Sequence, residues 1–124
     1  MTELEIWNHW LKRLPAYFEK YSCVELGFLK ESLEIDSDGY GGTDRLYYFE
    51  KESGAYYTQI SHWDGGNMFA NRSGSRTTLT KEMLVQVMTE RKNHIESTLS
   101  PDEKNEFEHI FQEMLTFLLR QFTA

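Results

Sequence analysis

The densest group of chemically functional side chains in this sequence lies at residues 34–44, which read EIDSDGYGGTD. The segment holds four carboxylates and three glycines, a composition that suits three different structures. A calcium-binding loop needs carboxylate oxygens around a glycine that permits a sharp turn. An acidic surface for a partner protein needs the charge itself. A turn between strands needs glycines for positive φ and aspartates for local hydrogen bonds.

The spacing of this segment matches only part of an EF-hand calcium loop. With Asp36 at position 1, a carboxylate recurs at position 3, a glycine at position 6 and Asp44 at position 9. Ligand positions 5 and 12 hold Tyr40 and Tyr47, so a cation that requires six or more oxygens is short of ligands. The residues that follow resemble a strand, where the motif requires a helix. We therefore predict no metal site, although a turn alone needs fewer carboxylates.

The histidines and the single cysteine do not form a zinc or catalytic motif. His62 is followed by Asp64, and such a pair can act as a base, but no suitable nucleophile accompanies it. Glu and His residues at helical spacing within 90–94 and 106–109 are typical of a solvated helix face. Cys23 lacks the flanking residues of a cysteine nucleophile. The sequence predicts no catalytic residue and no cofactor.

The chain is acidic. It carries 13 Lys and Arg residues against 20 Asp and Glu residues, which gives a formal net charge of −7. Residues 1–50 contribute −5 of this charge, with 5 basic and 10 acidic side chains. Nucleic-acid affinity depends mainly on contacts between basic side chains and phosphates, so we expect no binding to DNA or RNA. The charge favours a basic protein partner instead.

Length and composition predict a single domain over residues 1–124. An apolar share of 40%, with 15% aromatic residues, is sufficient for a hydrophobic core. A single cysteine excludes an internal disulfide, and no apolar run has the length of a membrane span. Residues 1–5 are acidic where a signal peptide has a basic start. We expect a cytoplasmic protein with no membrane partner, and the oligomeric state is left open.

The N-terminal segment predicts a helix with an aromatic stripe that packs into the core. Pro15 cannot donate a hydrogen bond within a helix, so we expect a kink or a break into two short helices there. The apolar residues of the stripe recur at spacings of three and four: Leu4, Trp7, Leu11, Leu14 and Phe18.

The central part predicts an antiparallel meander of three to four strands. Residues 23–36 combine alternating and helical spacings, and we favour a strand because the next segments are extended. Turns are indicated at 51–54 and 64–67. They separate three further segments with the composition of strands: residues 44–50, 55–63 and 68–71.

The C-terminal third predicts two consecutive helices. Thr80 is a suitable N-cap, with Leu79 and Leu84 placed for a hydrophobic staple, and the first helix extends to about residue 98. Residues 100–103 read SPDE and form a capping box that starts the second helix. These elements predict an α+β domain: an N-terminal helix, an antiparallel β-meander of three to four strands, and two C-terminal helices packed on the sheet.

Aromatic residues near the acidic segment predict a binding surface. A meander can bury only one face beneath the helices, so some of the rings at Tyr40, Tyr47, Tyr57 and Trp63 are expected to face outwards. Tyr and Trp are frequent at interface hot spots, and acidic rims accelerate association with basic partners. The alternative is that these rings only cover the sheet.

A short acidic α+β domain with a Trp-rich start, the meander YYFEKESGAYYTQISHWDGG and a carboxylate-lined loop resembles the immunity proteins of bacterial polymorphic-toxin and contact-dependent inhibition systems. The resemblance implies a bacterial, cytoplasmic toxin inhibitor that covers or displaces the active site of a cognate toxin domain, often a basic nuclease. Charge and aromatic character, not a motif, suggest the residues that bind this partner. They are Glu31, Glu34, Asp36, Asp38, Tyr40, Asp44, Trp63 and Asp64.

Two other functions compete with a toxin inhibitor. The first is a small ligand-binding or adaptor domain with a pocket on its sheet face. The second, less favoured, is a small enzyme that uses His62 and Asp64, because a site assembled in space leaves no linear motif.

Overall fold

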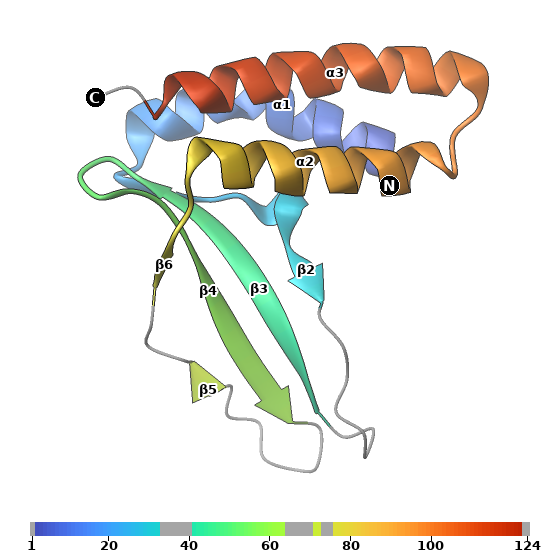
Figure 1. The fold of residues 1–124 in the computed structure, drawn as a ribbon. Helices are drawn as coiled ribbons and strands as arrows, with labels where there is room; N and C mark the ends of the chain where they lie inside the picture. The colour runs from blue at the N-terminus through green and yellow to red at the C-terminus, as the bar shows by residue number, and fades with distance from the viewer. Residues whose placement is uncertain (1, 33–40, 64–70, 73–75, 123–124) are drawn as a thin grey trace.

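The computed structural model has three helices gathered at one end of a long β-hairpin (Figure 1). The residues that it describes are 2–32, 41–63, 71–72 and 76–122. This arrangement confirms the predicted α+β class and the order of helix, antiparallel sheet and two helices. The elements are α1 (Glu3–Lys20), β1 (Cys23–Glu25), the 3-10 turn η1 (Gly27–Leu29), β2 (Glu31–Ser32), β3 (Gly41–Glu50), β4 (Gly54–Trp63), β5 (Asn71–Arg72), β6 (Thr77–Thr78), α2 (Lys81–Glu96) and α3 (Pro101–Arg120).

Helix α1 continues through Pro15 to its end at Lys20, so of the predicted kink or break, the break into two short helices does not occur. Pro15 itself is exposed. Leu14 before it is fully buried, and Phe18 after it contacts Phe49 with 5.5 Å between ring centroids. A proline inside a helix costs about 3 kcal/mol. Burial of apolar side chains on both sides of the proline offsets that cost and keeps the two halves on one core.

The segment between α1 and the hairpin is a strand only in part. Strand β1 is followed by the turn η1, and β2 has two residues. The turn buries Phe28 and Leu29, and Phe28 contacts Trp7 edge-on at 4.9 Å between ring centroids. The apolar spacing that suggested a continuous strand therefore reflects burial of a turned segment. Residues 33–36, which completed the predicted strand, lie outside the described residues.

Strands β3 and β4 form an antiparallel hairpin of 10 residues on each side. The register runs from Glu50 opposite Gly54 at the turn to Gly41 opposite Trp63 at the far end. Residues 51–53 form the predicted turn, and Gly54 follows with a φ of 86°, which L side chains rarely adopt. The turn therefore depends on the glycine at this position.

The remaining strands are short and pair with this hairpin. The sheet order is β1-β3-β4-β5, with β2 beside β3 and β6 beside β4, and all pairs are antiparallel. Strand β5 consists of Asn71 and Arg72. It overlaps the predicted segment 68–71 at Asn71 and extends one residue beyond it. The rest of that segment and the whole of the predicted turn at 64–67 fall outside the described residues.

Helix α2 begins where the sequence predicts. The Thr80 hydroxyl accepts a hydrogen bond from the Met83 amide at 3.2 Å. Leu79 and Leu84 are both buried, as a hydrophobic staple requires. The helix ends at Glu96, slightly before the predicted end.

Helix α3 begins at the predicted capping box. The Glu103 amide donates to the Ser100 hydroxyl at 3.3 Å, and the Ser100 amide donates to the Glu103 carboxylate at 3.0 Å. Two hydrogen bonds with Ser100 lower the pKa of Glu103. The bond from the Ser100 amide has the larger effect, and the bond with the Ser100 hydroxyl has the smaller one. Both ends of the predicted box are therefore formed.

We expect Ser100→Ala to lower the free energy of unfolding by about 1 kcal/mol, because it removes the hydroxyl that accepts the Glu103 amide. Urea denaturation followed by circular dichroism measures this change. Ser22→Ala is the matched control, since Ser22 is exposed and contributes its backbone carbonyl to a hydrogen bond with Lys51. An unchanged unfolding midpoint for Ser100→Ala would contradict the role of this cap.

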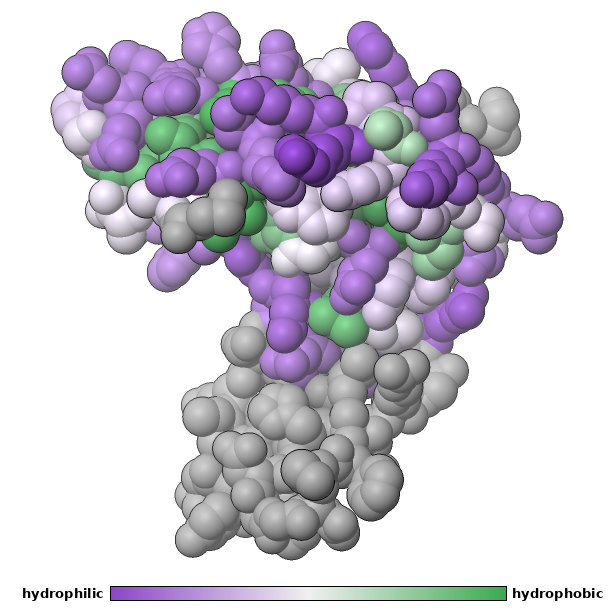
Figure 2. Space-filling model, turned by 180° about the vertical axis from the view of Figure 1, so that it is seen from behind, coloured by the Kyte–Doolittle hydropathy of each residue, from purple (hydrophilic) through white to green (hydrophobic). Residues whose placement is uncertain are grey.

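The core lies between the three helices and the turn end of the sheet. Trp7 of α1 is fully buried at its centre, in contact with η1 and α3 through Phe28 and Phe107. From behind, hydrophilic residues cover much of the outer helical surface, and hydrophobic residues show between the helices (Figure 2). Each helix therefore buries its apolar face and exposes its polar face.

Candidate partner-binding surface

The register of the hairpin separates its residues onto two faces. Tyr47 and Phe49 lie on the face toward the helices, where Tyr47 is fully buried and Phe49 contacts Phe18 of α1. Side chains alternate along a strand, so Tyr48 and Glu50 lie on the opposite face. The described helices all lie on one side of the sheet (Figure 1), and this second face has none of them against it.

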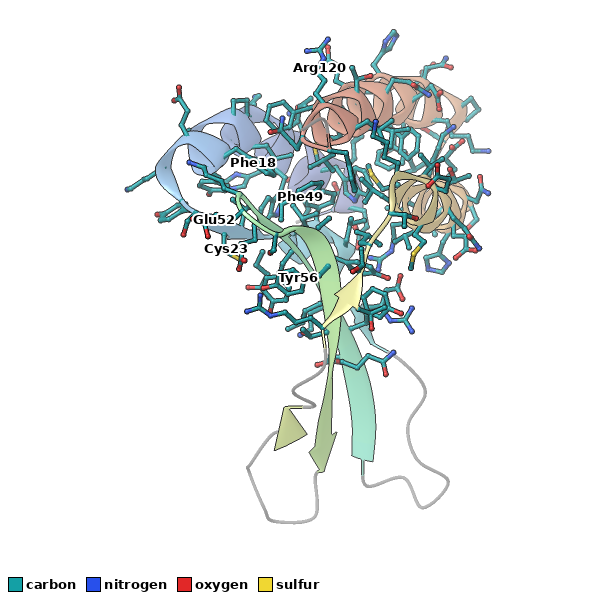
Figure 3. All side chains as sticks on the ribbon, turned by 60° about the vertical axis from the view of Figure 1, so that its left-hand side comes forward. Phe18, Cys23, Phe49, Glu52, Tyr56 and Arg120 are labelled. Atoms are coloured by element: carbon teal, nitrogen blue, oxygen red, sulfur yellow. The ribbon has the colours of Figure 1, made fainter. Side chains whose placement is uncertain are left out.

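One group of residues on the helix-free face is called the tyrosine face below. In the register, Tyr48 lies opposite Glu25 on one side and Tyr56 on the other, and Cys23 lies opposite Glu50. Figure 3 shows Cys23 and Tyr56 on the sheet, below the helices. With Arg76, which precedes β6, the tyrosine face comprises Cys23, Glu25, Tyr48, Glu50, Tyr56 and Arg76.

Two stacked rings form the centre of the tyrosine face. The rings of Tyr48 and Tyr56 are 5.0 Å apart between centroids and nearly parallel, at 16°. The Arg76 guanidinium lies 4.5 Å from the centre of the Tyr56 ring, and its Nη1 is 3.4 Å from Glu50 Oε2. An arginine gains from both contacts, since the ring face and the carboxylate each attract positive charge. This surface therefore accommodates a basic side chain.

Tyr56 as a whole is buried, with 9% of its surface exposed. Burial raises the pKa of Tyr56 to about 12, and the contact with Cys23 also raises it. The Cys23 sulfur lies 3.7 Å from this hydroxyl, at hydrogen-bonding distance for sulfur. Cys23 itself is exposed, although a free cysteine is more often buried. The phenol thus remains neutral at physiological pH, and the charges beside it are those of Glu50 and Arg76.

A shallow groove adjoins the tyrosine face between α1 and β1. Three aromatic residues form one wall, one from the middle of α1, one from its last turn and one just beyond it, and β1 forms the other wall. The rings of Trp10 and Tyr17 meet edge-on at 5.7 Å between centroids, and Tyr21 is 46% exposed. The groove has a volume of about 370 Å³ and is called the aromatic groove below; its lining is Trp10, Tyr17, Tyr21, Cys23, Val24 and Glu25.

Two of the predicted partner-binding carboxylates have described side chains, and both are held within the fold. Asp44 lies 3.7 Å from the Lys30 ammonium. Glu31 lies 3.9 Å from the Arg45 guanidinium and accepts a hydrogen bond from the Tyr47 hydroxyl at 3.0 Å. Glu31 pairs with Arg45 and Ser32 with Asp44, so the two carboxylates lie on opposite faces of the sheet. The structure does not bring them together.

The other predicted partner-binding residues have no described side chain. The backbone of Trp63 pairs with that of Gly41 at the far end of the hairpin, and the backbone of His62 pairs with that of Gly42. The remaining members of the predicted set lie outside the described residues: Glu34, Asp36, Asp38, Tyr40 and Asp64.

Tyr47 is not a surface aromatic, which corrects the interpretation of the sequence. Its position in β3 directs the ring toward the helices, next to the half-buried Tyr57 at 5.9 Å between centroids. Burial raises the pKa of Tyr47 to about 12, with a hydrogen bond to Arg45 acting in the opposite direction and the charge of Glu31 in the same direction. Tyr47 therefore anchors β3 to the core. The Arg45 guanidinium lies over the neighbouring Tyr57 ring, 4.8 Å from its centre.

Sequence reasoning missed the residues that form the tyrosine face. Strand parity contains the signal for Tyr48 and Tyr56, because Glu50 alternates with Phe49 and a glutamate is rarely buried. The face that includes Glu50 is therefore the solvent face. Arg76 has no comparable signal, since its contact with Glu50 joins residues 26 positions apart in the chain.

The described residues include no group of three or more His, Cys, Asp or Glu side chains placed to hold a metal ion. Strand β3 begins at Gly41, so an extended segment follows the acidic residues where an EF-hand requires a helix. Within this same part of the chain, no helix is long and apolar enough to cross a membrane.

Comparisons of the chain with family models, curated proteins and solved structures found no match. The tyrosine face and the aromatic groove are the parts of the described surface whose chemistry suits the binding of a partner.

Proposed function

We propose that this chain is an immunity protein that neutralises a cognate toxin by binding a basic region of the toxin with the tyrosine face. The observation that carries the proposal is the contact of Arg76 with the Tyr56 ring and the Glu50 carboxylate. The chain thereby presents, on its helix-free face, the two groups that recognise a guanidinium.

Arg76 is weakly held, so an arginine of a partner can replace it. The Arg76 side chain is 57% exposed, and exposed ion pairs contribute about 0–1 kcal/mol to stability. An arginine from a docked protein would shield the same site from water, which strengthens the contact with Tyr56 and Glu50. Exchange of one arginine for another therefore favours the complex.

The surrounding charge supports a basic partner. Glu25 is exposed beside Tyr48, and none of the described residues forms an ion pair with it. The chain as a whole carries −7, which steers a basic protein toward it and raises the association rate. In a basic nuclease, Glu25 and Glu50 would bind the positive groups that otherwise hold substrate phosphates.

The first test is co-expression with the candidate toxin domain encoded immediately upstream, with growth rescue and co-purification as the two measurements. Rescue together with a stoichiometric complex is the expected result. A neighbouring domain that is neither toxic nor bound would overturn the immunity proposal and favour the ligand-binding or adaptor alternative.

Matched charge neutralisations locate the interface. We expect Glu25→Gln with Glu50→Gln to weaken toxin binding about a hundredfold or more, because two charge-assisted contacts of roughly 1.5–3 kcal/mol each are lost. Surface plasmon resonance at two salt concentrations measures affinity and association rate. The control is Glu106→Gln with Glu113→Gln, which removes the same charge from exposed positions of α3.

A second pair distinguishes the tyrosine face from the acidic segment. Asp36→Asn with Asp38→Asn again removes two negative charges, now from residues 34–44. A large loss of affinity for this pair, with none for Glu25 and Glu50, would place the interface at the acidic segment and contradict the tyrosine face.

A further inference from the structure

We propose that the open edge of β1 binds an extended segment of a partner protein as an additional strand, with a Lys or Arg side chain of that segment in the aromatic groove. This inference deepens the proposed function and rests on it, since it specifies how a protein partner is held. The observations behind it are the direction of the β1 backbone groups, the lining of the groove and the charge of Glu25.

The hydrogen bonds that flank β1 show which of its backbone groups point outwards. The Ser22 carbonyl accepts from the amide just after β3 at 2.9 Å, and the Leu26 amide donates to a carbonyl of β3 at 2.8 Å. Residues of an antiparallel strand alternate between bonding toward the neighbour and away from it. Cys23 and Glu25 therefore direct their amides and carbonyls away from β3. Strand β1 pairs only with β3 among the described strands, so this edge is open.

The aromatic groove lies along that edge. Its lining includes all three residues of β1, and the rings of Trp10, Tyr17 and Tyr21 form the opposite wall. A Cβ at Gly27 would lie 3.0 Å from Trp10, so the backbone there fits closely under the indole and fixes its position. An extended segment that bonds to Cys23 and Glu25 would place alternate side chains against these rings.

Charge selects a basic segment for this groove. The exposed Glu25 carboxylate is part of the lining and has no ion-pair partner among the described residues. The neighbouring aromatic rings also attract cations: the Lys20 ammonium already lies 5.4 Å from the centre of the Tyr21 ring. An acidic segment would bring its carboxylates beside Glu25. A second copy of this chain also carries −7, so mutual repulsion disfavours pairing of two β1 edges.

The test uses isotopically labelled protein and a synthetic peptide with alternating valine and lysine, acetylated and amidated at its ends. We expect the peptide, titrated to millimolar concentration, to shift the backbone amide signals of Cys23 and Glu25 and the indole signal of Trp10. The same peptide with glutamate in place of lysine should bind at least about ten times more weakly. Glu25→Lys, which changes only an exposed side chain, should reverse that preference.

Each outcome of this titration decides the inference. No shift at millimolar lysine peptide, or shifts centred away from β1, would overturn it. Shifts of the same amides with protein concentration alone, together with a dimer in sedimentation, would assign the edge to a second copy. The peptide titration does not use the toxin, so the two proposals can fail separately. If the peptide binds at β1 but the toxin does not bind the protein, the proposed function alone is rejected. Toxin binding without peptide docking would reject the groove alone.

Discussion

Trp7→Ala is expected to lower the free energy of unfolding by about 3–5 kcal/mol, the range for deleting a fully buried large aromatic side chain. The Trp7 ring lies 4.9 Å from that of Phe28, 5.1 Å from that of Phe107 and 6.2 Å from that of Phe111. It therefore joins α1, η1 and α3, and the cavity would open between all three. A domain of this size has a total stability of about 5–15 kcal/mol, so urea or thermal unfolding detects such a loss readily.

Two further variants separate the volume of Trp7 from its polar atom. The Trp7 indole nitrogen is buried with no hydrogen-bond partner in the described structure, and an unpaired buried donor costs about 1–3 kcal/mol. Trp7→Phe removes this donor along with part of the ring, so we expect it to cost less than about 2 kcal/mol. Val85→Ala on the exposed side of α2 serves as the control. A loss below about 1 kcal/mol for Trp7→Ala would contradict the central position of this ring.

Alkaline pH is expected to destabilise the fold by a few kcal/mol, through two tyrosines. The pKa values of Tyr47 and Tyr56 are raised from 10.0 to about 12, mainly by burial. Between these pH values the folded state retains protons that the unfolded chain has lost, so stability falls as pH rises through this range. Below pH 10 both states are protonated and the full contribution is present. Each pKa unit corresponds to about 1.36 kcal/mol, so both tyrosines contribute to the loss.

Unfolding by urea at a series of pH values between 9 and 12.5 measures this effect. Tyr47→Phe and Tyr56→Phe should each remove about half of the alkaline loss, because phenylalanine does not titrate. Tyr21→Phe is the control, since Tyr21 is 46% exposed and the loss should persist without its hydroxyl. If the double variant Tyr47→Phe with Tyr56→Phe loses as much stability at high pH as the parent protein, the burial of these two hydroxyls is not the cause.

The acidic composition of the first 50 residues overstates the negative charge that the sheet offers to a partner. Glu31, Asp44 and Glu50 each lie within 4 Å of a basic group of the same chain, at distances of 3.9, 3.7 and 3.4 Å. These pairs are partly exposed, so they set the positions of the side chains more than they stabilise the fold. The carboxylate of Glu25 differs, because it is exposed and no described residue pairs with it. Among the described residues of the sheet, the negative charge available to a partner is therefore more localised than the composition suggests.

Local sequence signals define where the two C-terminal helices and the hairpin turn begin. The Thr80 cap, the capping box at Ser100 and Glu103, and the glycine at position 54 act through bonds and dihedral angles within a few residues. The α+β class follows from the order of these elements. The acidic segment at 34–44 remains a sequence-based prediction, since most of it lies outside the described residues.

Features that depend on contacts between distant residues emerge only in the folded chain. Helix α1 passes through Pro15 because both of its halves are buried against one core, and the chain turns at η1 because Phe28 meets Trp7 there. Local sequence propensity predicts neither of these contacts. The tyrosine face requires Arg76 to reach Glu50, and the open edge of β1 exists because its only described neighbour is β3. Binding surfaces of this kind arise from residues far apart in sequence, so linear spacing predicts the elements but not the site that they form.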